Sequence, residues 1–116
     1  MPADASLTTK LTATQAEAIA LTFVSNEWEL SEDDRDWFTV LSSRFVGESW
    51  YVVELGIEGL PDKWVFQVYD TGVCDPNYTF VTPVSASELD TGLSDFPEHL
   101  AEVVTLERRN WLVSKP

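Results

Sequence analysis

The stretch that decides the fold is residues 47–70, GESWYVVELGIEGLPDKWVFQVYD. It contains two runs rich in β-branched and aromatic residues, and in each run apolar side chains recur at every second position. The segment between the runs, GLPD at residues 59–62, is typical of a turn, because Pro61 suits the second position of a β-turn. The stretch therefore predicts a β-hairpin with strands over residues 49–57 and 63–69.

The alternation assigns the hairpin side chains to two faces. One face would carry the larger apolar set: Tyr51, Val53, Leu55, Ile57, Trp64, Phe66 and Val68. The opposite face would carry Trp50, Val52, Val65 and Tyr69. Antiparallel sheets usually leave one face to water, so a second apolar face predicts a cover: the C-terminal helix, a second copy of the chain, or a partner. We take these four residues as candidate partner-binding residues.

A helix is predicted before the strands, over about residues 14–28. A capping box would open it, formed either by Thr12 with Gln15 or by Thr14 with Glu17. Its apolar residues recur at helical spacing and form one stripe, which is expected to pack on the sheet: Ala16, Ile19, Ala20, Phe23 and Val24.

Two further strands and a second helix complete the pattern. The strands are predicted over residues 37–46 and 78–84, and a capping box of Ser85 and Glu88 indicates a short helical turn after them. The second helix would be capped by Ser94 or Asp95, with Pro97 in its first turn. Arg108 and Arg109 would lie in its last turn, where the helix dipole favours cations.

The resulting order, α-β-β-β-β-α, predicts an α+β fold: an N-terminal helix packed on a four-stranded antiparallel meander, followed by a C-terminal helix. Residues 1–11 are predicted to be frayed, and residues 12–116 to form a single domain. The length of 116 residues and the hydrophobic content of 44% suit one globular core.

Charge and cysteine content limit the classes of function. Twenty acidic and seven basic residues give a net charge of −13, which repels nucleic acid and anionic membranes and permits a basic protein partner. No apolar run is long enough to span a membrane. The single cysteine, Cys74, excludes an internal disulfide, and no signal peptide is visible; both favour a cytoplasmic protein. A secreted protein with its signal removed would look the same.

The alanine-rich helix segment ATQAEAIALTFV, followed by strands that end in Tyr69-Asp70-Thr71-Gly72-Val73, resembles PepSY-like domains and the wider cystatin-like α+β group. The resemblance covers roughly residues 12–84. It implies a non-catalytic binding or inhibitory module, and it assigns no functional residue. The chain departs from the family in its C-terminal helix and in the lack of a visible secretion signal.

Several motifs invite a catalytic or metal-binding interpretation, and each has a simpler one. The tripeptide Asp-Thr-Gly occurs at Asp70 and again at Asp90, as in aspartic proteases, but a turn with glycine at positive φ explains it without the missing scaffold. The acidic run at residues 27–36 lacks the glycine of a Ca²⁺ loop and is interpreted as a solvated charge run. His99 and Cys74 could pair only if the fold brought them together. We predict no catalytic, cofactor-binding or metal-binding residue.

The sequence therefore predicts a non-catalytic protein-binding module with an acidic surface, similar in role to an inhibitor or immunity protein. Its partner would be a basic protein. Two alternatives stay open: a small enzyme or ligand carrier with a pocket between helix and sheet, and a homodimeric structural protein.

Overall fold

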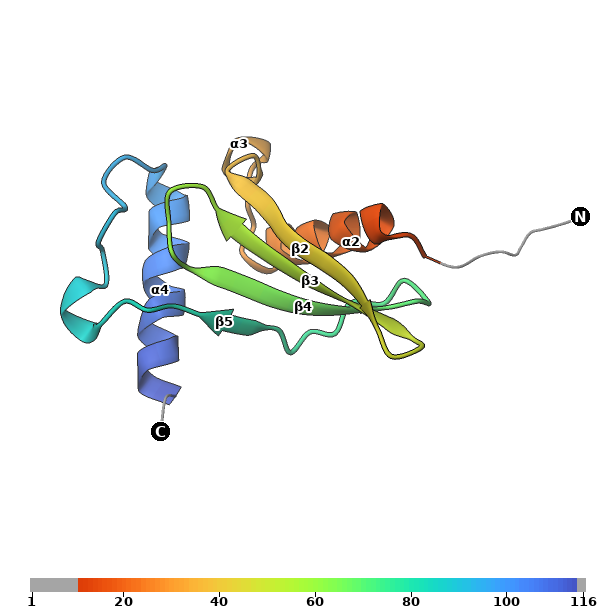
Figure 1. Cartoon of the computed structure of the whole chain (residues 1–116). Helices are drawn as coiled ribbons and strands as arrows, with labels where there is room; N and C mark the ends of the chain where they lie inside the picture. Colours follow the sequence, from red (N-terminus) through yellow and green to blue (C-terminus); the bar gives the residue numbers. More distant parts are fainter. Residues whose placement is uncertain (1–10, 115–116) are drawn as a thin grey trace, which may run out of the picture.

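The chain runs from an N-terminal helix through four antiparallel strands to a C-terminal helix, as the sequence predicts (Figure 1). The computed structural model describes residues 11–114. The expected frayed segment therefore lies outside the described residues, apart from Leu11. None of the helices in the described part of the chain is long and apolar enough to cross a bilayer.

The sheet is a meander in which each strand pairs with the next along the chain. Its order is β2-β3-β4-β5, all antiparallel. The strands are β2 (Phe38–Val46), β3 (Trp50–Ile57), β4 (Lys63–Tyr69) and β5 (Thr79–Val81). The last strand is shorter than the predicted residues 78–84, because it pairs only with residues 63–65 of β4. Further along that edge Asp75 N–H donates to Gln67 O, and at the other end β4 begins at Lys63.

Helix α2 (Ala13–Glu27) begins at the first of the two predicted capping boxes. Thr12 accepts from the backbone N–H of Gln15, whose side chain accepts from the N–H of Thr12. The helix ends where Glu29 adopts a positive φ of 52° and Leu30 N–H donates to Ser25 O over 2.8 Å. That six-to-one bond is typical of a helix C-terminus that stops in a left-handed residue.

The face that α2 presents to the sheet differs slightly from the predicted stripe. Ala16, Ala20 and Val24 are fully buried, whereas Ile19 and Phe23 are only partly buried at the border. The two alanines let the helix backbone approach the sheet closely, and the larger side chains pack along its sides. Phe23 makes edge contacts with the rings of Phe66 and Tyr78.

The acidic connector contains one turn of helix, α3 (Glu32–Arg35). Ser31 caps it by accepting from the N–H of Asp34 over 3.1 Å. Three of the six carboxylates of the acidic run lie in the first turn of α3, where the helix dipole favours negative charge. Asp34 is buried, so the interpretation of a solvated charge run is wrong at this residue.

A short 3₁₀ turn, η1 (Ala86–Glu88), carries the predicted capping box of Ser85 and Glu88, and α4 (Glu98–Ser114) follows. Pro97 directly precedes α4, and its carbonyl accepts the first helical hydrogen bond from Ala101 N–H. The helix continues beyond Arg109 to Ser114, so the prediction that Arg108 and Arg109 form its last turn is wrong. Arg108 is instead buried in the middle of the helix.

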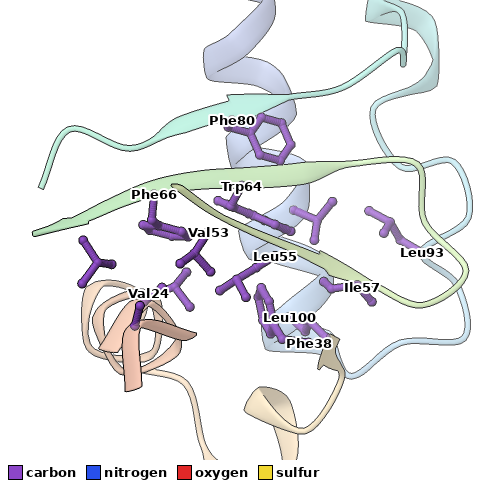
Figure 2. Packing of buried hydrophobic residues seen from close by; sticks show 14 residues of the cluster. Val24, Phe38, Val53, Leu55, Ile57, Trp64, Phe66, Phe80, Leu93 and Leu100 are labelled. Carbon is purple, nitrogen blue, oxygen red and sulfur yellow. The ribbon is translucent and has the colours of Figure 1, made fainter. Parts of the chain in front are cut away.

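Both long helices lie on the same face of the sheet. Leu55 and Trp64 are opposite each other on neighbouring strands and point to this face. Phe23 of α2 contacts Phe66 on this face, and Glu107 of α4 accepts a hydrogen bond from Trp64. Figure 2 shows the buried side chains that join the sheet to the two helices, including Val24 and Leu100. We call this covered side the inner face.

Candidate interaction surface

The outer face of the sheet carries the four predicted partner-binding residues. Trp50 and Tyr69 are directly opposite each other on β3 and β4. Val52 and Val65 lie on the same side of the sheet, further along the strands, opposite Gln67 and Glu54. All four are partly buried by their neighbours. Within residues 11–114, no helix covers this face. The C-terminal helix, one of the covers expected from the sequence, packs on the inner face instead.

The neighbouring strands extend the outer face. Val46 is opposite Trp50, and Val81 is opposite Lys63 at the other side. The register shifts between Val40 and Ser42, which marks a bulge at Leu41. A Cβ on Gly56 would lie 2.9 Å from Leu41 Cδ1, so the glycine leaves the space in which Leu41 lies over the sheet.

Charge on the outer face is nearly balanced, unlike that of the whole chain. Arg44 is opposite Val52, and Lys63 forms an ion pair with Glu54 at 3.3 Å. Carboxylates lie at the end of the face that holds Trp50 and Tyr69: Glu48 in the β2–β3 turn and Asp70 after β4. The surface therefore combines an aromatic pair, Trp50 and Tyr69, beside an acidic border with a mixed row of apolar and charged side chains further along the strands.

Asp75 belongs to the same border. The hydroxyl of Tyr69 donates to Asp75 Oδ2 over 3.2 Å. The negative charge of Asp75, together with this hydrogen bond, raises the pKa of Tyr69, so the phenol stays neutral and keeps its donor. The contact holds the Tyr69 side chain over the sheet.

A buried ion pair lies at the β3–β4 turn, on the side of the molecule occupied by α4. Arg108 Nη2 is 2.7 Å from Asp62 Oδ2, and both side chains are completely buried. Thr82 donates to Asp62 over 2.6 Å, and Arg108 Nη1 donates to the carbonyl oxygens of Leu89 and Thr91. Because the partners come from the β3–β4 turn, from the residue after β5 and from the loop before α4, the cluster ties this helix to the sheet and to that loop.

A second buried carboxylate belongs to Glu107 of α4. Its Oε2 accepts from Trp64 Nε1 over 2.6 Å. Burial raises the pKa of Glu107, and the hydrogen-bonding groups of Trp64 and Tyr78 offset part of that effect. Because its hydrogen bond with Trp64 joins β4 to α4, we assign Glu107 a structural role.

Replacement of Glu107 tests that assignment through pH. Folding raises this pKa, so the folded chain holds the proton of Glu107 more tightly than the unfolded chain does. Ionisation therefore costs stability as pH rises above the range in which a free glutamate titrates. We expect the free energy of unfolding of the parent to fall relative to that of Glu107→Gln as pH rises above about 4.

Urea denaturation across this pH range measures the difference. Glu102 is exposed on the same helix, so Glu102→Gln controls for the loss of one negative charge from a chain of net charge −13. If the free energy of unfolding of the parent instead rises relative to that of Glu107→Gln at higher pH, the assignment is contradicted.

The two Asp-Thr-Gly tripeptides lie at opposite ends of β4. Asp70 follows that strand, and its N–H donates to Ser49 O. Asp90 belongs to the loop that Arg108 holds beside the start of the strand. The seven residues of β4 span about 20 Å, so the carboxylates do not share a proton as a protease pair would. Gly72 and Gly92 both have positive φ, as the turn interpretation predicts.

His99 and Cys74 have separate surroundings. His99 Nε2 donates to Trp28 O over 2.8 Å, so it links the first turn of α4 to the end of α2. Cys74 pairs with Val68 near the far end of β4. Burial, and then the charge of Asp75, raises the pKa of the Cys74 thiol to about 11, which makes it a poor nucleophile at neutral pH. The geometry gives neither residue a catalytic role.

The part of the chain that the structure describes holds no group of three or more histidine, cysteine or carboxylate side chains arranged to bind a metal ion. Comparison of the chain with protein-family models, with curated proteins and with solved structures found no match in any of the three.

Proposed function

We propose that this chain is a non-catalytic protein-binding module that binds a basic protein partner through the outer face of its sheet. The observation that carries the proposal is the position of Trp50, Val52, Val65 and Tyr69 on a face that neither long helix covers. Tryptophan and tyrosine bury large areas with little side-chain entropy to lose, and they are enriched at the centres of protein interfaces.

Charge favours a basic protein over a second copy. Two copies would each bring a net charge of −13, and a face-to-face pair would bring the acidic borders around Glu48 and Asp70 together. A partner with an apolar patch flanked by basic side chains would match the end of this surface that carries Trp50 and Tyr69, and attraction at long range would speed its approach. An inhibitor or immunity protein that masks a basic enzyme would act in this way.

The alternative of a ligand carrier rests on a pocket between helix and sheet. In the described structure that interface holds fully buried core side chains, among them Val24, Phe66 and Leu100 (Figure 2). This filled interface supports the choice of a surface, rather than an interior site, as the functional part of the molecule.

Affinity purification with matched variants tests the proposal. The parent chain, a Trp50→Ser/Val65→Ser variant and a Val73→Ser control would each be incubated with native extract, and bound proteins identified by mass spectrometry. Val73 is exposed in the turn after β4 and is not one of the four proposed binding residues. We expect a basic protein that the parent and Val73→Ser retain and the double variant loses. Equal recovery by all three would contradict the proposal, and sedimentation as a dimer would favour the homodimer.

Truncation of Trp50 provides a quantitative prediction. Its side chain is only partly buried, so Trp50→Ala is expected to weaken partner binding more than it weakens folding. An interface centre of this kind typically loses about 2 kcal/mol or more, or roughly 30-fold in Kd. Calorimetric titration with the identified partner measures the change in Kd, and urea denaturation of the same variant measures the change in the free energy of unfolding. A loss of several kcal/mol in stability with unchanged binding would identify Trp50 as ordinary core.

A further inference from the structure

A groove of about 660 Å³ lies on the side of α4 that faces away from the sheet, where the loop before the helix passes it. Leu93, Ala101 and Leu106 provide apolar lining, and Leu106 is 41% exposed. This volume falls in the range of sites that bind small molecules or individual side chains of a partner. The groove is separate from the outer face of the sheet, because α4 packs on the inner face.

The wall of the groove is held in place from inside the protein. Arg108 Nη1 donates to Leu89 O over 3.0 Å and to Thr91 O over 2.9 Å, and these carbonyls belong to the loop segment that forms the wall. Leu93, at the end of the same segment, is anchored in the core. A wall fixed in this way needs little ordering when a ligand binds, which favours affinity.

The charges along the groove are unequal. Asp90, Glu98 and Glu102 contribute carboxylates, and Arg109 contributes the one cation among the lining residues. Glu98 and Glu102 are four residues apart on α4 and therefore lie on the same side of the helix, next to the apolar lining. The net charge of −13 for the whole chain strengthens the attraction of a cation to this region.

We propose that this groove is a second docking surface, which binds a segment of a partner protein that carries an apolar side chain flanked by lysine or arginine. The apolar side chain contacts Leu93 and Leu106, and the flanking cations pair with Glu98 and Glu102. The inference does not depend on the proposal for the outer face of the sheet, because its residues and its contacts are different.

The test uses labelled synthetic peptides as probes. One peptide contains only leucine and lysine in an amphipathic order; in two matched peptides serine replaces leucine or glutamate replaces lysine. Fluorescence anisotropy with the full chain gives the Kd values. We expect the leucine–lysine peptide to bind about tenfold or more tightly than either matched peptide, since both apolar contact and charge contribute. If the serine–lysine peptide binds as tightly as the leucine–lysine peptide, the binding arises from non-specific charge attraction, and the proposal is overturned.

Variants of the groove locate the binding. Leu106→Ser and Glu98→Gln/Glu102→Gln, all at exposed positions, are each expected to weaken binding about fivefold or more while the denaturation midpoint stays close to that of the parent. Trp50→Ala should leave this affinity unchanged. Amide chemical shifts should move in residues 89–109. Shifts confined to the outer face of the sheet, with groove variants of unchanged affinity, would overturn the groove proposal and leave the proposal for the sheet standing.

Discussion

Arg108→Met is expected to lower the free energy of unfolding by about 3–5 kcal/mol, because it leaves the buried carboxylate of Asp62 without its cation. Both side chains are completely buried, and Arg108 Nε and Nη2 together make three contacts of 2.7–3.3 Å with the Asp62 oxygens. The carbonyl oxygens of Leu89 and Thr91 lose their donor in the same variant. Methionine fills much of the space, so loss of charge pairing dominates over loss of volume.

Chemical denaturation measures this loss, and two variants control it. Arg109→Met removes a neighbouring but exposed arginine and is expected to change stability by no more than about 0.5 kcal/mol. The double variant Asp62→Leu/Arg108→Met replaces the whole pair by apolar groups and should recover much of the loss. A cost of less than about 1 kcal/mol for Arg108→Met would show that the pair is open to water.

The strands and helices were predictable because their signals are local. Alternation in residues 47–70 assigns Trp50 and Tyr51 to opposite faces, and the observed register agrees. The capping boxes of Thr12 and Ser85 each involve a residue only three positions away, so their backbone geometry follows from short-range hydrogen bonds. The fold class follows from the order of these elements. The resemblance to PepSY-like and cystatin-like domains stays a hypothesis.

The buried arginine was not predicted, although the sequence contains a sign of it. Leu100, Val104 and Arg108 are four residues apart, so Arg108 occupies a position of the apolar stripe of α4. We interpreted it by the preference of helix ends for cations, which requires only the local sequence. Its partner Asp62 is 46 residues away in the β3–β4 turn, and no local pattern relates the two.

The face of the sheet that α4 covers was also beyond sequence reasoning. Both faces carry aromatic residues, so hydrophobic pattern alone does not choose between them. In the structure Leu100 and Val104 join α4 to the core of the inner face, and two polar contacts at long range add to them: Trp64 with Glu107, and Asp62 with Arg108. Trp64 and Asp62 belong to the hairpin, and Glu107 and Arg108 belong to α4. Because these contacts lie on the inner side, α4 leaves the outer face, with its four predicted binding residues, uncovered in the described structure.

Trp64→Ala is expected to cost about 3–5 kcal/mol, the range for loss of a large aromatic side chain from a core. Trp64 is fully buried, and its ring contacts Phe38 on one side and Phe80 on the other. Its Nε1 is also the donor to Glu107. The residue therefore joins three strands to α4, through apolar packing and through one hydrogen bond to a buried carboxylate.

Trp64→Phe separates these two contributions, because phenylalanine keeps most of the apolar contact and lacks the N–H. It leaves Glu107 without this donor in a buried site, at an expected cost of about 1.5–3 kcal/mol when Glu107 is ionised. Protonation of Glu107 removes its charge, so the cost should shrink at low pH, where a carboxyl whose pKa burial has raised is neutral. At a pH high enough to ionise Glu107, the double variant Trp64→Phe/Glu107→Leu should be less destabilised than Trp64→Phe alone. If Trp64→Phe is as stable as the parent at every pH, the hydrogen bond does not hold α4 on the inner face, and apolar packing together with the Arg108–Asp62 pair must account for the position of this helix.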